Sequence, residues 1–195
     1  MPDTNRILDF WLNEVGPKGW YDPPEGLDDD IRAEFLPAWE KAREKKPDRF
    51  NCNAESILAF ILLTDQFPRN MFRGDARAFE TDELARKAAQ RAIHHRWDMR
   101  IPEPERQFFY LPLMHSEIVA DQERCVRLFL TRMPETGAEN LLHARAHRNI
   151  IRQFGRFPYR NAALGRTTRP EEQAFLDAGG YQHAVAQLGP RKLAG

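Results

Sequence analysis

The sequence has few of the features that mark a secreted or membrane protein. Only two cysteines, Cys52 and Cys125, occur among 195 residues, far apart and without the spacing of a metal motif. We therefore expect reduced thiols rather than a disulfide. The longest apolar run, residues 57–63, is too short to span a bilayer, and the first residues lack the basic segment and apolar stretch of a signal peptide. Together these absences predict a cytoplasmic protein.

Neither sign of charge is in excess, since 29 lysines and arginines accompany 29 aspartates and glutamates. Proteins that hold nucleic acid without regard to its sequence need a surplus of cations along one face. Adsorption to anionic membranes needs a similar surplus. The balance therefore predicts neither a nucleic-acid partner nor a membrane partner.

Motifs for the common catalytic chemistries are also missing. The sequence contains no glycine-rich phosphate loop, no nucleophile motif, no Cys–His pair and no HExxH zinc signature. The alternation of apolar and polar residues that marks half-buried strands is absent as well. A functional site in this chain is therefore expected to consist of side chains that helices and their turns bring together.

What the sequence does have is helical periodicity along nearly its whole length. The pattern predicts helices over residues 7–11, 27–42, 54–67, 81–93, 105–130 with a break or kink at Pro112, 139–154 and 170–176. Residues 16–26, rich in proline and glycine, predict a loop, and residues 182–195 a frayed tail. We therefore predict one all-α domain over residues 1–195, either an orthogonal bundle or a degenerate α-solenoid.

A short pattern occurs twice in the chain. Residues 66–70 read QFPRN and residues 156–161 read RFPYRN, so that Phe-Pro is followed by Arg-Asn in both. Each copy follows the end of an apolar helix. Chance recurrence of common helix-stop residues is the plain explanation, but the shared setting favours a paired role for the two turns.

Asp65 lies on the apolar face of the predicted helix 54–67, in its last turn, where the helix dipole disfavours a carboxylate. A buried carboxylate needs a cation or several hydrogen-bond donors. The candidate partners are Arg69, Arg73, Arg156 and Arg160. A structural Asp–Arg clamp is favoured over catalysis, because structural ion pairs perturb carboxylates as readily as active sites do.

Three histidines are predicted to point inward. His143 and His147 share the apolar face of helix 139–154, and His115 is placed on an inner face with Ile118 and Val119. They could ligate a metal, or His115 or His147 could move protons beside a carboxylate. Inward histidines in helical proteins are more often hydrogen-bonded core residues, so no metal site is predicted.

Three segments, residues 61–79, 110–117 and 147–161, together resemble the DUF924 family of uncharacterised bacterial and fungal proteins. The DQFPRN and RFPYRN strings within them are the most specific part of the resemblance. It implies a helical fold similar to the tetratricopeptide-repeat superfamily, and it supplies no function. Two positions depart from the family pattern: Tyr159 stands where a histidine is usual, and Met114 where a glutamate is usual.

We predict that the two Phe-Pro turns and the inward histidines form one small-molecule site. Four arginines there would suit an anionic ligand such as a phosphate or a carboxylate. The predicted acid–base residues are Asp65, His115, Glu117 and His147. The predicted ligand-binding residues are Arg69, Asn70, Arg73, Arg156, Arg160 and Asn161. No metal and no cofactor is assigned.

Two alternatives stay open at this point. The chain could be a scaffold that binds a protein or peptide in a concave groove, as helical solenoids do. The polar cluster could also be purely architectural, in which case removing Asp65 or Arg156 lowers folding stability and no ligand exists.

Overall fold

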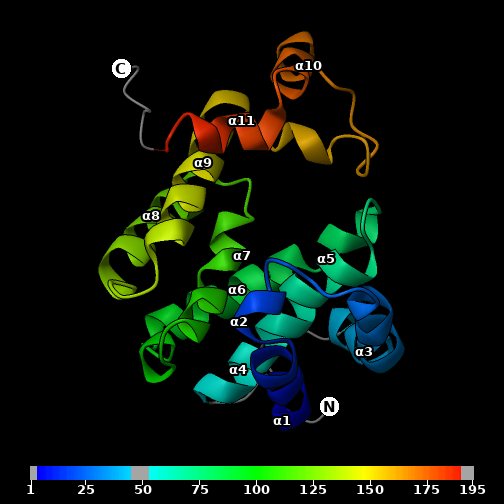
Figure 1. Ribbon diagram of the computed structural model, residues 1–195, viewed down its shortest axis with the longest axis vertical. Helices are drawn as coiled ribbons and strands as arrows, with labels where there is room; N and C mark the ends of the chain where they lie inside the picture. Colours follow the sequence, from blue (N-terminus) through cyan, green and yellow to red (C-terminus); the bar gives the residue numbers. More distant parts are fainter. Residues whose placement is uncertain (1–3, 45–52, 190–195) are drawn as a thin grey trace. The chain divides into compact units, whose positions relative to one another are not determined.

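The computed structural model describes residues 4–44 and 53–189 of the chain (Figure 1). Those residues form helices joined by turns, with no strand among them, which confirms the all-α prediction. Contacts divide the chain into two compact units, Met1–Pro112 and Leu113–Gly195. The single-domain and solenoid arrangements stay predictions. Cys52 and Pro47, which the sequence suggested as a helix stop, lie outside the described residues.

Unit 1 consists of short helices around an aromatic core. In chain order they are α1 (Thr4–Leu8), a π-helical segment (Asp9–Val15), α2 (Gly16–Gly19), α3 (Leu27–Arg43), α4 (Ala54–Ile61), a second π-helical segment (Leu62–Gln66), α5 (Phe67–Met71), a 3-10 turn (Ala76–Phe79), α6 (Asp82–His94) and two further 3-10 turns (Asp98–Arg100 and Glu105–Phe109). The predicted loop 16–26 thus begins with one helical turn, which Pro17 favours because its fixed φ suits a first helical position.

The predicted inner face of α3 is buried as expected, at Leu27, Ile31, Phe35, Trp39 and Ala42. The ring of Phe35 lies 4.7 Å from that of Phe67, centroid to centroid. Large rings of this kind contribute the greatest apolar area to a core.

Unit 2 consists of α8 (Val119–Arg132), α9 (Ala138–Phe154), α10 (Pro170–Asp177) and α11 (Gly180–Ala186), with a 3-10 turn at Pro158–Arg160. Helices α8 and α9 lie side by side (Figure 1). Gly155, with φ of 73°, ends α9 by donating its N–H to the Ile151 carbonyl, as predicted. Helix α11 extends into the segment that was predicted to fray.

The helix break predicted at Pro112 falls elsewhere. Pro112 lies inside the short helix α7 (Leu111–Met114), and α8 begins only at Val119. Proline is tolerated in a first helical turn, where its missing N–H has no helical partner. Because the helical phase starts later than assumed, Ile118 and Val119 are exposed, and their predicted inward orientation was wrong.

Pro68 shapes the most apolar helix without ending it. The π-helical segment precedes it, and α5 then continues to Met71. Pro68 has no N–H to give to the Thr64 carbonyl. That carbonyl instead accepts a hydrogen bond from the Thr81 hydroxyl at 2.7 Å, and Thr81 Oγ1 accepts from the Trp39 indole at 3.1 Å. Thr81 is the N-cap residue of α6, but its side chain makes no capping hydrogen bond there because the hydroxyl is used in these two contacts.

Replacing Thr81 with valine should therefore destabilise unit 1. The change keeps the side-chain shape but leaves the Thr64 carbonyl and the Trp39 indole without this partner, both in a buried setting. We expect the free energy of unfolding to fall by about 2 kcal/mol in urea denaturation. Thr81→Ser keeps the hydroxyl, so its free energy of unfolding should fall by less than that of Thr81→Val. Equal decreases in the two variants would contradict this account.

Candidate functional site

The first Phe-Pro turn holds Asp65 in an ion pair. Asp65 is fully buried, and Arg69 Nη1 lies 3.2 Å from its Oδ1. Gln66 donates from its amide to the other carboxylate oxygen. The second guanidinium nitrogen of Arg69 donates to Asp82 at 2.9 Å. Asp65 thus pairs with Arg69, one of the four arginines that the sequence offered as partners.

Asn70 and Arg73 belong to the same turn and face outward. The Asn70 amide donates to the Gln66 carbonyl at 3.1 Å. Arg73 donates to the Asp28 carboxylate and, at 2.8 Å, to the Asn70 side-chain oxygen. Arg69 and Arg73 thus both bind carboxylates of the protein itself, which reduces their value as sites for an external anion.

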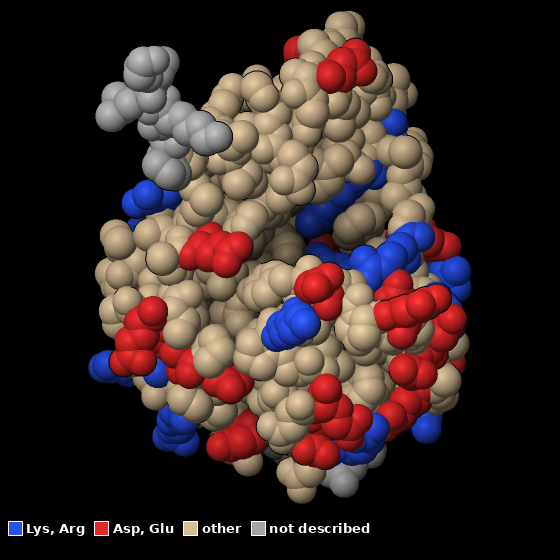
Figure 2. Space-filling view, viewed as in Figure 1, with Lys and Arg blue, Asp and Glu red and all other residues tan. Residues whose placement is uncertain are grey.

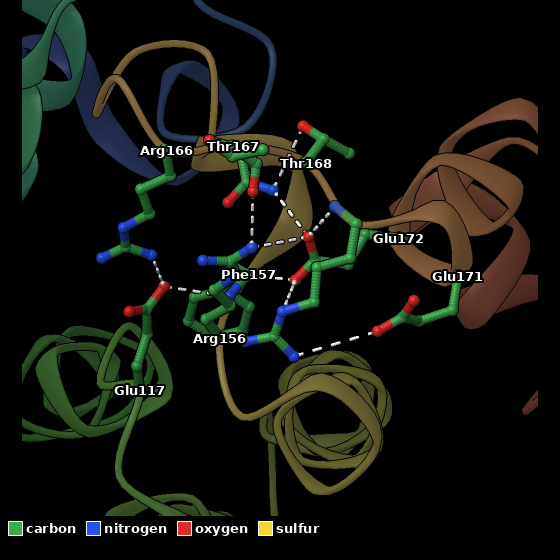
Figure 3. A network of polar contacts seen from close by, with 10 residues as sticks. Glu117, Arg156, Phe157, Arg166, Thr167, Thr168, Glu171 and Glu172 are labelled. Carbon is green, nitrogen blue, oxygen red and sulfur yellow. Dashed lines mark hydrogen bonds and ion pairs between the residues drawn. The ribbon is translucent and has the colours of Figure 1, made fainter.

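The second Phe-Pro turn is anchored in the same manner within unit 2 (Figure 3). Arg156 forms a bidentate pair with Glu172, Nε to Oε1 at 2.6 Å and Nη2 to Oε2 at 2.7 Å, and also donates to the Thr167 carbonyl at 2.8 Å. Asn161 donates to Glu172 Oε2 at 3.1 Å. The Arg156 hydrogen bonds lower the pKa of the fully buried Glu172 to about 2.

Glu172 also helps to cap the start of α10, one position later than the sequence suggests. The sequence suggested a capping box from Thr168 to Glu171. In the structure Pro170 takes the first helical position and Arg169 becomes the N-cap, so Glu172 falls at the third helical position. Its carboxylate accepts the Arg169 backbone N–H at 2.8 Å.

Each of the two turns therefore makes the same kind of contact within its own unit. Arg69 of the first turn binds Asp82, the first residue of α6, and Arg156 and Asn161 of the second bind Glu172 in the first turn of α10. A carboxylate at a helix N-terminus is also favoured by the helix dipole. Each Phe-Pro turn thus ties itself to the start of the next α-helix.

Glu117 is held between a backbone donor and a guanidinium (Figure 3). Its Oε1 accepts the Phe157 N–H and Arg166 Nη1, each at 2.9 Å. Burial alone would raise the pKa of Glu117, but the hydrogen bonds from Arg166 and Phe157 and the charge of Arg160 lower it. Arg166 was not predicted, because it lies in a loop 49 residues from Glu117, where helical periodicity carries no signal.

His147 is buried and neutral. Its Nδ1 lies 2.9 Å from the His143 carbonyl, which can only accept, so Nδ1 carries the proton and Nε2 keeps a lone pair. Burial, with smaller contributions from the charges of His115 and Arg160, lowers the pKa of His147 to about 3.

Aromatic rings surround this imidazole. The ring centroids of Tyr181, Phe157 and His115 lie 4.8, 5.3 and 6.4 Å from that of His147. His115 lies in the turn after α7 and is half-buried rather than part of a helix. Among residues 4–44 and 53–189, no three His, Cys, Asp or Glu side chains are placed to hold a metal ion.

Arg160 completes this cluster. It is only 6% exposed, and its guanidinium carbon lies 4.6 Å from the centroid of the Phe157 ring. The same ring also contacts His147, so Phe157 links the two polar side chains. We call His115, His147, Phe157, Arg160 and Tyr181 the histidine cluster.

Comparison with known proteins places the chain in a family. The DUF924 family, described as bacterial protein of unknown function, matches residues 7–180. The chain belongs to this family. A solved structure of a protein of unknown function from Agrobacterium tumefaciens is similar to it, with 42% identity, a TM-score of 0.82, and coverage of 90% of this chain and 97% of that one. No curated protein matches.

Membership of the DUF924 family confirms the resemblance seen in the sequence but assigns no activity. Within the part of the chain that the structure describes, no helix is both long and apolar enough to cross a membrane.

Proposed function

We propose that the protein binds a small anionic molecule at the histidine cluster of unit 2. The observation that carries the proposal is His147, a buried neutral imidazole whose Nε2 is an acceptor, beside the Phe157 ring that also contacts the Arg160 guanidinium.

Arg160 supports an anionic ligand. A guanidinium presents a planar fork of donors that matches carboxylate and phosphate oxygens. Contact with the Phe157 ring limits the orientations of that fork, which lowers the entropy lost on binding. Its charge is one of the smaller causes that lower the pKa of both His147 and Glu117.

His147 supports a ligand that also carries a donor. Its Nε2 can accept one hydrogen bond from a hydroxyl or amine. A molecule with an anionic group and a neighbouring hydroxyl, such as a hydroxycarboxylate or a phosphorylated alcohol, satisfies both residues. In the free protein a pKa of about 3 makes His147 a weak base at neutral pH. A bound anion would raise that pKa, so we expect His147 to transfer protons only while the anion is bound.

The proposal moves the ligand site away from Arg69, Arg73 and Arg156, whose carboxylate partners favour an anchoring role. A cytoplasmic location, the absence of nucleic-acid and membrane partners, a tetratricopeptide-like arrangement and the peptide-binding alternative stay predictions.

A thermal-shift screen tests the proposal. Inorganic phosphate, hydroxycarboxylates and phosphorylated alcohols are each added to the purified protein. A ligand at 100 times its Kd adds about 2.7 kcal/mol of stability, which corresponds to roughly 5–10 °C in Tm for a chain of this size.

Two variants and one control localise the effect. Arg160→Gln and His147→Phe should each reduce the shift, measured against that variant's own Tm. Arg152→Gln removes one positive charge from the exposed face of α9, where Arg152 pairs with Glu123. This control variant should show the same ligand-induced shift in Tm as the wild-type protein. A panel without any shift, or a shift that survives both cluster variants, would refute the proposal.

A further inference from the structure

Two consecutive glycines with positive φ stand where α11 begins, Gly179 in the link from α10 and Gly180 as the first residue of α11. Gly179 has φ of 102° and Gly180 has φ of 55°. Residues with a side chain rarely adopt such backbone angles, whereas glycine passes between positive and negative φ at little cost. The connection can therefore change direction without strain in the helices on either side of it.

Helix α11 is also lightly packed. Gly180 is its only buried residue. Ala184 and Tyr181 are partly buried against the α9 residues Ile150 and Phe154. A pocket of about 520 Å³, partly open to solvent, lies between α9, α10 and α11 and is lined in part by Ile150, Phe175, Ala184 and Leu188. An element with few buried apolar contacts separates from its neighbours at a lower free energy than the core does, and α11 is such an element.

On the face shown in Figure 2, few charged side chains lie over these three helices. Arg156 and Glu172 anchor the start of α10, whereas no ion pair of a described residue holds α11. Motion of α11 would therefore break ring contacts and one side-chain hydrogen bond, and would leave the anchor of α10 in place.

That hydrogen bond joins Tyr181 to His143. The Tyr181 hydroxyl contacts His143 Nδ1, and the Tyr181 ring lies 4.8 Å from the His147 ring, centroid to centroid. Burial raises the pKa of Tyr181, so its hydroxyl stays protonated and can donate to the imidazole. The first turn of α11 thus places one aromatic side chain against His147 and fastens it to the neighbouring histidine.

We infer that α11 is a lid that turns at Gly179–Gly180 and carries Tyr181 away from His147. In the closed state Tyr181 restricts access to the imidazole, and in the open state the imidazole is accessible to a ligand. Only the identity of what enters rests on the proposed function. The motion itself rests on the glycine pair, the light packing of α11 and the Tyr181 contacts.

Two measurements on the ligand-free protein test the lid. Hydrogen exchange should show the α11 amides of Ala184 and Val185 exchanging faster than the α9 amides of Ile150 and Ile151. Diethyl pyrocarbonate modification, followed by mass spectrometry, should label His147 slowly in the wild-type protein. Tyr181→Ala should raise that rate several-fold, while exposed His183 on α11 reacts at an unchanged rate.

Tyr159→Ala is the matched control, because Tyr159 contacts Phe157 and Tyr181 but does not belong to α11. Tyr159→Ala should leave the rate at which diethyl pyrocarbonate labels His147 near the wild-type value. If Tyr181→Ala does not fold, Tyr181→Phe removes only the hydroxyl and should still speed exchange in α11. Equal protection of α11 and α9, or an unchanged His147 rate without Tyr181, would refute the lid. Neither readout uses a ligand, so this failure is separate from failure of the proposed function.

Discussion

Asp65→Ala should lower the free energy of unfolding by about 3–5 kcal/mol, because it breaks a buried charge pair and leaves Arg69 with one carboxylate fewer. For a chain of this length the loss corresponds to a decrease in Tm on the order of 10 °C. Urea denaturation followed by circular dichroism gives the free energy, and calorimetry gives the Tm.

The control for this change is Asp29→Ala. Asp29 also pairs with an arginine, Arg32, but its side chain is 83% exposed. Solvent screens such a pair, so the substitution should cost at most about 1 kcal/mol. Similar losses for Asp65→Ala and Asp29→Ala would show that the Asp65 clamp does not stabilise the fold in the way its burial suggests.

Glu172→Gln should produce the second large loss. The new side chain has nearly the same shape, but it no longer accepts the bidentate pair from Arg156, and it faces the Asn161 amide with only one acceptor oxygen. We expect a decrease in Tm on the order of 10 °C in calorimetry at pH 7. Glu171→Gln alters the neighbouring exposed glutamate and should leave the Tm almost unchanged.

The same variant gives a pH dependence with a defined sign. The pKa of Glu172 falls from an ordinary 4.5 to about 2 in the folded protein. A carboxylate with a lowered folded pKa stabilises the fold above its unfolded pKa, and that stabilisation is lost as pH falls toward the folded value. The Tm difference between wild type and Glu172→Gln should therefore shrink between about pH 4.5 and pH 2. A difference that stays constant over this range would contradict the Arg156–Glu172 account.

Local patterns predicted the contacts that lie within one helix or one turn. The inner faces of α3 and α9 follow from residue spacing, and the Asp65–Arg69 pair follows from a four-residue separation at a helix end. His147 was also placed correctly on an inner face. In each case the geometry of a single helix is enough to bring the residues together.

Contacts between distant segments could not be predicted in this way. Arg166 reaches Glu117, and Glu172 reaches Arg156, through loops whose path the residue spacing does not encode. Tyr181 was placed at the edge of a frayed tail, because a seven-residue helix after two glycines has too little periodicity to be recognised. The neutral state of His147 depends on burial by those same segments.

The proposed function depends most directly on the protonation of His147. Two-dimensional ¹H–¹⁵N NMR of protein labelled at histidine, recorded from pH 8 to pH 4, reports the tautomer and the titration of each imidazole. The structure predicts that His147 carries its proton on Nδ1 and does not titrate over this range, because its pKa is about 3. A proton on Nε2, or titration of His147 near pH 6.5, would contradict the account.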